Sequence, residues 1–370
     1  MAPSLSREAA PGAAALAAAA AVGTAAGLLL ASAALRHRRL TWLLGAGASA
    51  TGGAVKAAAP DPSFERLSAS SAAHRQWMQQ MRSFIFDIDG VIHVAGTPVP
   101  GAADAIAALR EAGKQVIFMT NNAGKTPQDL VALFAKMGVM AVEAEVVTSA
   151  MAAASYLASC GLQGKAVYVV GLDSLARVLR ERAEVVPFGA EADAAKTRED
   201  CEREFKHAMD PPAESVSAVV VGVDYRFNYF KLTRAANYLR ANRDCLFVAT
   251  NPDPRASLGP AAIVPAAGSL VEAVACAAGR RPDIVCGKPS RSLAAHLLET
   301  RGMAPATTCM VGDRTDTDME FGRCVGMQTL FVESGSMTEA EARADEPQRH
   351  PHFTAPSIAV LRDLLKPLAR

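Results

Sequence analysis

The 370-residue sequence is poor in aromatic residues and has no large excess of either charge. Aromatic side chains make up 5% of the chain, and 38 basic residues nearly balance 37 acidic ones. Proteins that bind nucleic acid through its phosphates usually have a strong basic excess, so we expect no nucleic-acid partner. Half of the residues are apolar, which excludes disorder along the whole chain.

The sequence also lacks paired cysteines and glycosylation acceptors. Its seven cysteines include no C-x-x-C pair, and the pattern Asn-x-Ser/Thr does not occur. Several of the cysteines lie in apolar runs, where a free cysteine behaves as a small buried hydrophobe. A zinc site or a disulfide framework is therefore not expected, and a reducing compartment is favoured.

An alanine-rich segment stands at the N-terminus. Residues 9–35 have no charge, and the basic cluster Arg36-His37-Arg38-Arg39 follows them. We assign residues 1–75 to this non-globular segment and its linker, and three interpretations stay open. In the first, the segment is a removable targeting sequence, which predicts a cytoplasmic or organellar (plastid or mitochondrial) protein. In the second it is a retained membrane anchor, and in the third it is a disordered leader. An anchor would leave the rest of the chain in the cytoplasm, because basic residues follow the apolar stretch.

From residue 82 onward, short apolar runs alternate with segments of helical periodicity. This alternation predicts an α/β fold, in which parallel sheets are covered by helices on both faces. Ligands bind such sheets at the carboxyl ends of the strands. The expected strands are 84–86, 116–119, 146–147, 167–170, 219–221, 246–248, 284–285, 310–311 and 330–332, and the expected helices include 102–112, 127–137, 150–159 and 290–301.

Polar residues suited to metal or phosphate follow two of the early strands. Asp87 and Asp89 leave the first strand, and Gly90 permits a turn that would bring the two carboxylates to one site. A close acidic pair repels itself unless a cation neutralises it, which points to Mg²⁺ bound through oxygen atoms. Thr120 and Asn121 end the second strand and offer hydrogen-bond donors to an anion.

Two later strand ends have the same character. Lys288 stands at a strand end just before an expected helix, where a positive charge and a helix N-terminus together favour an anion. Asp313, Asp316 and Asp318 follow the next strand and offer a second set of Mg²⁺ ligands. In isolation each of the four signals also fits a solvated loop.

In combination and in this order, the four segments resemble the motifs of the haloacid dehalogenase (HAD) superfamily. They are DIDG, the Thr of FMTNN, the Lys of GKP, and GDRTDTD, and the resemblance covers roughly residues 82–365. It implies a Rossmann-like parallel-sheet core at 76–163 and 265–370, interrupted by an α/β cap domain at 164–264. The segments 221–232, 249–253 and 267–269 look like the large cap of the NagD-like branch, which includes 4-nitrophenylphosphatase, phosphoglycolate phosphatase and pyridoxal-phosphate phosphatase.

The resemblance also implies a role for each motif residue. Asp87 would be the nucleophile that forms an aspartyl-phosphate, and Asp89 the general acid and base. Lys288 would bind the phosphoryl group with Thr120 and Asn121. Mg²⁺ would be held by Asp87, the backbone carbonyl of Asp89, and Asp313, with Asp318 behind them, and the cap residues Asp224, Tyr225 and Lys231 are candidate substrate contacts.

The function expected from this resemblance is Mg²⁺-dependent hydrolysis of a small phosphorylated metabolite. Phosphoglycolate or a 4-nitrophenyl-phosphate-like ester is the first expectation, and pyridoxal phosphate or a sugar phosphate is the alternative. Relatives with such caps are often dimers, so a homodimer is expected. The alternative that is not an enzyme is a membrane-tethered scaffold with an inactive HAD domain.

Overall fold

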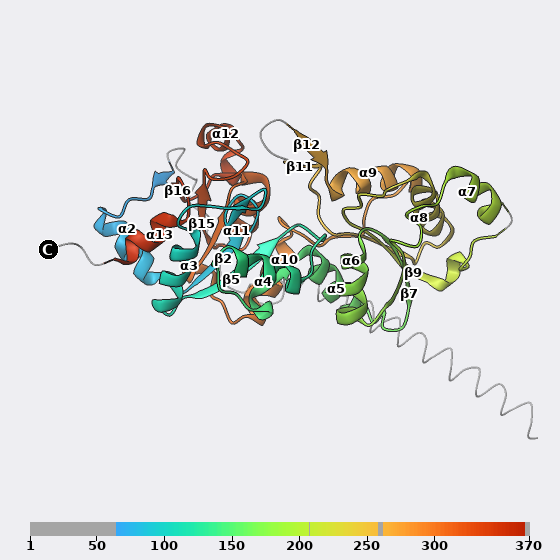
Figure 1. Cartoon of the computed structure of the whole chain (residues 1–370), viewed down its shortest axis with the longest axis horizontal. Coiled ribbons are helices and arrows are strands. Elements are labelled where there is room, and N and C mark those ends of the chain that lie inside the picture. Colours follow the sequence, from blue (N-terminus) through green and yellow to red (C-terminus); the bar gives the residue numbers. More distant parts are fainter. Residues whose placement is uncertain (1–63, 207, 258–261, 367–370) are drawn as a thin grey trace, which may run out of the picture.

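The computed structural model describes residues 64–206, 208–257 and 262–366. They form two separate parallel sheets with helices packed on them, arranged end to end along the long axis (Figure 1). Each expected apolar run forms a strand, so the predicted α/β class is confirmed. Two antiparallel hairpins lie outside these sheets: β3 (His93–Val94) with β4 (Thr97–Pro98), and β11 (Arg255–Ser257) with β12 (Ile263–Pro265).

The first sheet has seven strands in the order β1-β16-β15-β14-β2-β5-β6, and all neighbouring pairs are parallel. Strands β14, β2 and β5 are adjacent, so the carboxyl ends that precede Asp313, Asp89 and Asn121 lie side by side. The strands are β1 (Glu65–Arg66), β2 (Ser83–Asp87), β5 (Gln115–Thr120), β6 (Val146–Thr148), β14 (Thr308–Gly312), β15 (Gln328–Val332) and β16 (Phe353–Ala355).

Helices cover both faces of this sheet because its central strands are apolar on both sides. Phe84 and Phe86 of β2 pack against α2, α3, α4 and α13, whereas Ile85 packs on the opposite side with α10 and α11. These helices are α2 (Ala72–Gln80), α3 (Ala102–Glu111), α4 (Pro127–Lys136), α10 (Arg291–Thr300), α11 (Glu320–Arg323) and α13 (Ala359–Leu365); α12 (Glu339–Ala344) packs beside Phe64 and Phe331.

The second sheet has five parallel strands in the order β13-β10-β9-β7-β8. Helices α8 and α9 cover one face, and α5 and α6 cover the other. The elements are α5 (Ser149–Ser159), β7 (Ala166–Val170), α6 (Asp173–Ala183), β8 (Val186–Gly189), α7 (Arg198–Phe205), β9 (Val216–Val221), α8 (Tyr229–Ala241), β10 (Leu246–Ala249), α9 (Ala267–Ala278) and β13 (Ile284–Val285).

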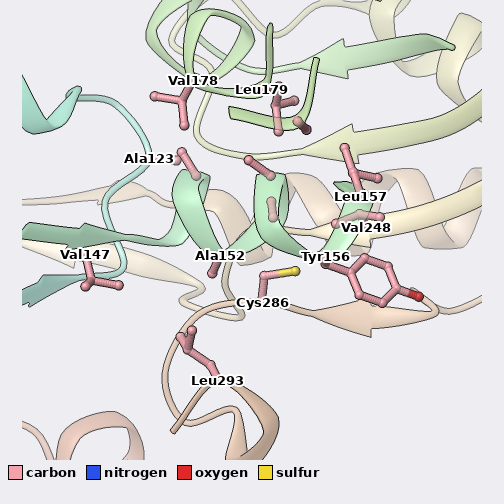
Figure 2. Close-up of a cluster of buried hydrophobic side chains, with 14 of the residues drawn as sticks. Ala123, Val147, Ala152, Tyr156, Leu157, Val178, Leu179, Val248, Cys286 and Leu293 are labelled. Carbon is pink, nitrogen blue, oxygen red and sulfur yellow. The ribbon is translucent and has the colours of Figure 1, made fainter. Parts of the chain in front are cut away.

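A continuous apolar cluster joins the two parts of the protein. Figure 2 shows Val147 of the first sheet and Leu293 of α10 in the same cluster as Val178, Leu179 and Val248 of the second part. Burial of this shared surface stabilises the arrangement of the two sheets. The remaining short elements are 3₁₀ turns η1 (Glu143–Glu145), η2 (Ala213–Ser215), η3 (Pro305–Thr307) and η5 (Pro347–Arg349), and the π-helical turn η4 (Thr315–Met319).

The predicted domain boundaries differ from the structure at three points, and one of them is residue 163, because α5 was expected in the first core segment (76–163) but packs on the second sheet. The boundary at residue 75 is too late, because β1 pairs with β16 and Phe64 and Leu67 are buried in the core. The boundary at residue 264 is too early, because β13 pairs with β10 of the second sheet and α9 packs on that sheet. An apolar run predicts a strand but does not tell which sheet the strand joins. For this reason the boundary predicted at residue 264 was wrong.

The predictions for the alanine-rich leader fall on residues 1–63, which lie outside the described part of the chain. Within that part, no helix combines the length and the apolar character that crossing a membrane requires.

Candidate active site

A cavity of about 360 Å³ lies at the carboxyl ends of the first sheet, where the second part of the protein faces it. Asp87, Thr120 and Asp313 line it from the first sheet, and Tyr225 and Arg255 line it from the other side. Its volume is at the low end of the range for small-molecule sites. The strand-end rule therefore located the cavity correctly.

Lys288 is the centre of a buried ionic cluster on the floor of this cavity. Its Nζ lies 2.6 Å from Oδ1 of Asp87 and 2.6 Å from Oδ1 of Asp318. The Lys288 residue is only 2% exposed, and Asp318 is fully buried. Burial alone would lower the pKa of the lysine, but the two carboxylates outweigh it, so its pKa is raised and the ammonium stays charged.

Asp313 completes a group of three buried carboxylates. Oxygen atoms of Asp87, Asp313 and Asp318 lie within 4.8 Å of one another. Burial, together with repulsion among the carboxylates, raises the pKa of Asp87 and of Asp318 to about 7 and that of Asp313 to about 6. Three carboxylates beside one ammonium leave two uncompensated negative charges when ionised, which is the charge that a divalent cation neutralises.

Close backbone approach orients Asp313. Its Oδ2 accepts hydrogen bonds from the backbone N–H of Ser336 at 2.6 Å and from the Ser336 hydroxyl at 2.8 Å. Gly90, with φ +86°, and Gly335 both pass so near this carboxylate that a Cβ at either position would overlap it. Glycine is therefore required at Gly90, in the turn after β2, and at Gly335, in the loop after β15.

Asp89 has a different environment from the other acids. Its side chain is 59% exposed and lines the cavity. The hydroxyl of Thr120 lies 3.4 Å from Asp89 Oδ2, and Nε2 of His93 lies 3.8 Å from Asp89 Oδ1. The site therefore places one carboxylate, Asp87, in an ion pair and a second, Asp89, free to contact a ligand in the cavity.

Asn121 lies at the site, but its side chain is already engaged. Its Oδ1 accepts a hydrogen bond from the backbone N–H of Lys288 at 2.7 Å. Its Nδ2 donates to the carbonyl of Lys288 at 3.0 Å and to Oδ2 of Asp253 at 2.9 Å. The amide group that the sequence suggested for phosphate binding holds the lysine loop instead.

The cavity includes only one of the three predicted cap contacts. Tyr225 lines it and is 73% exposed. Asp224 and Lys231 form an ion pair of 2.6 Å in which each side chain is 1% exposed, and they do not line the cavity. The structure does not place these two residues at the cavity: Lys231 is in the first turn of α8, and its side chain reaches Asp224 in the loop between β9 and α8.

Sequence reasoning missed three charged residues that line the cavity: Asp253, Arg255 and Arg314. Asp253 and Arg255 follow β10, a strand of the second sheet, and the rule applied to the first sheet would have singled them out. Arg314 is adjacent to Asp313 and is paired with Asp316 at 2.6 Å. Its position in the sequence, directly after a predicted metal ligand, was the available signal.

Comparisons with known proteins agree with this geometry. The profile described as haloacid dehalogenase-like hydrolase matches residues 84–183, and the one described as HAD-hydrolase-like matches residues 285–361. Phosphoglycolate phosphatase 2 of Arabidopsis thaliana is 35% identical over 273 residues, which are 73% of this chain and 89% of the relative. Chronophin of Mus musculus is 36% identical, covering 82% of this chain and 98% of the relative.

Solved structures show the same likeness. The glycerol phosphate phosphatase of Mycobacterium tuberculosis, solved in complex with magnesium, superposes with a TM-score of 0.64 at 28% identity, covering 77% of each chain. NagD of E. coli superposes with a TM-score of 0.60 at 28% identity, over 75% of this chain and 97% of that one. The chain therefore belongs to the haloacid dehalogenase-like hydrolase family and is a phosphatase.

Proposed function

We propose that the protein is a Mg²⁺-dependent phosphatase that hydrolyses small phosphate monoesters through a phosphorylated Asp87. The observation that supports this most strongly is the cluster of Asp87, Lys288, Asp313 and Asp318 on the floor of a cavity of about 360 Å³. It joins a nucleophile, a fixed cation and a cation-binding acidic group at one point. The first substrate candidates are phosphoglycolate and 4-nitrophenyl-phosphate-like esters, and the alternatives are pyridoxal phosphate and sugar phosphates.

The residues present fit Mg²⁺. Asp87 and Asp313 offer carboxylate oxygens, and Asp89 can add its backbone carbonyl. Burial and mutual repulsion raise the pKa values of Asp87 and Asp313, and a bound cation would offset that repulsion. Asp318 accepts hydrogen bonds from Lys288 and from the backbone N–H of Arg314, so it supports the group from behind. When bound, the metal supplies positive charge beside a phosphoryl oxygen and neutralises the acids.

Asp87 begins the proposed reaction. Its carboxylate oxygen attacks phosphorus, the bond from phosphorus to the ester oxygen breaks, and Asp89 donates a proton to the departing alcohol. Asp89 then accepts a proton from the water that attacks phosphorus, the bond to Asp87 breaks, and phosphate leaves. The exposure of Asp89 in the cavity lets it reach both the alcohol and the water.

Lys288 and Thr120 would bind the transferring phosphoryl group. Its negative charge is the main demand on the site, and Lys288 supplies a buried cation whose raised pKa keeps it charged. Asn121 contributes by holding the Lys288 loop, and we assign phosphate contact to its backbone N–H rather than to its engaged side chain.

The residues that line the cavity from the second part of the protein would select the substrate. Tyr225 and Val223 face the cavity there, and Val94 lines it from the β3–β4 hairpin. A wall of this kind closes over the phosphoryl group and excludes water. Dimerisation through this part and the fate of residues 1–63 remain predictions, which light scattering and the mature N-terminal sequence test directly.

The activity test is hydrolysis of a panel of phosphate monoesters by the purified full chain. We expect turnover with Mg²⁺, none with EDTA, and a loss of at least about 10³-fold in Asp87→Asn. Asp244→Asn, an exposed substitution of the same kind, serves as the control. If Asp87→Asn hydrolyses the esters at the wild-type rate, the assignment of the nucleophile is wrong.

A further inference from the structure

Arg255 is the one cation of the cavity lining, within the described residues, that has no counter-charge. Lys288 is held by Asp87 and Asp318, and Arg314 is paired with Asp316 at 2.6 Å. Arg255 is exposed on strand β11, and its guanidinium forms no ion pair or hydrogen bond with any described residue. A free guanidinium on the wall of a binding cavity is available to a ligand.

The backbone that presents Arg255 is held in place. Asp253, two residues earlier, accepts a hydrogen bond from Asn121 at 2.9 Å, and Asn121 is bonded to Lys288. The carbonyl of Asp253 also accepts the backbone N–H of Gly268 at 2.8 Å, and Gly268 passes so close to Pro252 that a Cβ there would overlap it. Arg255 is therefore carried on a segment bonded to the same residue that positions the phosphate-binding lysine.

Among the described residues that line the cavity from the second part of the protein, Arg255 is the only one with a positive charge. Its strand neighbour Pro265 lines the cavity, and so do Val223, Ala256 and Val264. Arg255 is exposed, and so are its neighbours Ala256 and Pro265, so a ligand in the cavity can reach the guanidinium. The planar guanidinium matches a carboxylate through two parallel hydrogen bonds.

We propose that Arg255 is a specificity-determining residue that binds a second anionic group, a carboxylate, on the alcohol portion of the substrate. This inference rests on the proposed phosphatase function and narrows its substrate class to small carboxylated phosphate monoesters. Lys288 and its neighbours bind the phosphoryl end, and Arg255 binds the carboxylate at the other end of a short molecule. The limited cavity volume keeps that molecule small.

The test compares 2-phosphoglycolate with ethyl phosphate, which has a methyl group in place of the carboxylate. We expect Arg255→Met to lower the ratio of kcat/KM values for the two esters by about 10-fold to 100-fold, because a charge-assisted hydrogen-bonded pair is lost. Arg255→Lys keeps the charge without the fork and should give an intermediate ratio. Arg240→Met, an exposed arginine on α8 outside the cavity, is the matched control and should keep the wild-type ratio.

The outcomes separate this inference from the proposed function. An unchanged ratio in Arg255→Met, with both esters still hydrolysed, overturns the role of Arg255 and leaves the phosphatase mechanism standing. Equal losses for both esters also overturn it, because they indicate a structural effect. If the wild-type protein hydrolyses neither these esters nor any other phosphate monoester, the proposed function fails and this inference fails with it.

Discussion

Asn121 and Lys288 are bonded to each other through both ends of the Asn121 amide. Oδ1 of Asn121 accepts the backbone N–H of Lys288 at 2.7 Å, and Nδ2 donates to the Lys288 carbonyl at 3.0 Å. The two residues are 167 positions apart, and the whole second sheet is built from the chain between them. These two hydrogen bonds hold the backbone of Lys288 at the end of the first sheet, and they thereby position the lysine ammonium.

Asn121→Ala should therefore lower both stability and turnover. The substitution removes the hydrogen bonds to Lys288 and to Asp253, at roughly 1 kcal/mol each, so we expect a loss of about 2 to 4 kcal/mol in the free energy of unfolding. We also expect kcat to fall at least about tenfold, because Lys288 loses its backbone support. Urea unfolding and steady-state kinetics measure the two effects. Asn237→Ala, which removes a single bond within α8, is the control, and wild-type values for Asn121→Ala would contradict this account.

The buried pair of Asp224 and Lys231 should contribute to stability. Asp224→Ala leaves the Lys231 ammonium buried without its partner, and such a loss costs about 3 to 5 kcal/mol. Replacing both, as Asp224→Leu with Lys231→Met, should cost less than the single substitution because no charge remains. Chemical denaturation of the three proteins tests the order. A selective loss of turnover without a loss of stability would restore these residues as substrate contacts.

His352 should make the protein sensitive to acid. Its Nδ1 accepts the backbone N–H of Thr329 at 3.1 Å, so this nitrogen must be unprotonated, and burial with the nearby Arg323 charge lowers the pKa of His352 from 6.5 to about 4. Because the folded pKa lies below the unfolded one, this stabilisation is complete above about pH 6.5 and is lost as the pH falls toward 4.

The difference between the wild type and His352→Asn isolates this contribution. The Asn side chain offers an acceptor that does not titrate, so between pH 7 and pH 5 the wild type should lose about 2 kcal/mol more than the variant. Denaturation at the two pH values measures it. Equal losses in both proteins would show that His352 does not titrate on unfolding.

Mg²⁺ should raise the melting temperature of the protein. A ligand that binds only the folded state stabilises it by about 2.7 kcal/mol at 100 times its Kd, which corresponds to a rise in Tm of about 5 °C in a protein of this size. Asp313→Asn removes one of the carboxylates of the cluster and should abolish most of the rise, whereas Asp244→Asn should keep it. A rise of the same size in Asp313→Asn would place the metal elsewhere.

The strand ends of the first sheet were predictable because one physical rule covers them. Apolar runs predict parallel strands, and parallel strands bring their carboxyl ends to one edge, so Asp87, Thr120 and Asp313 could be grouped without any knowledge of contacts. Lys288 joined them through its place in the order of motifs. The class of the fold and the floor of the site follow from this rule.

The wall of the cavity was less predictable because it depends on pairings between distant residues. Nothing in the pattern shows that Asn121 would bond the Lys288 backbone, or that Asp224 would be neutralised by Lys231 instead of a substrate. Arg255 lies on a short hairpin after β10, a strand of the second sheet to which the strand-end rule was not applied. Strand β1 has two residues, too few for a pattern, whereas β13 was predicted as a strand and only its membership of the second sheet was missed.

The central claim is that Asp87 becomes phosphorylated, and trapping the phosphorylated protein tests it most directly. Asp89→Asn lacks the base that activates water, but 4-nitrophenolate departs without a proton, so the variant should form the intermediate and hydrolyse it slowly. Acid quenching after reaction with ³²P-labelled 4-nitrophenyl phosphate and Mg²⁺, followed by peptide mapping, should place one phosphoryl group on Asp87. Release of 4-nitrophenol with no labelled protein, or label on another residue, would contradict the account.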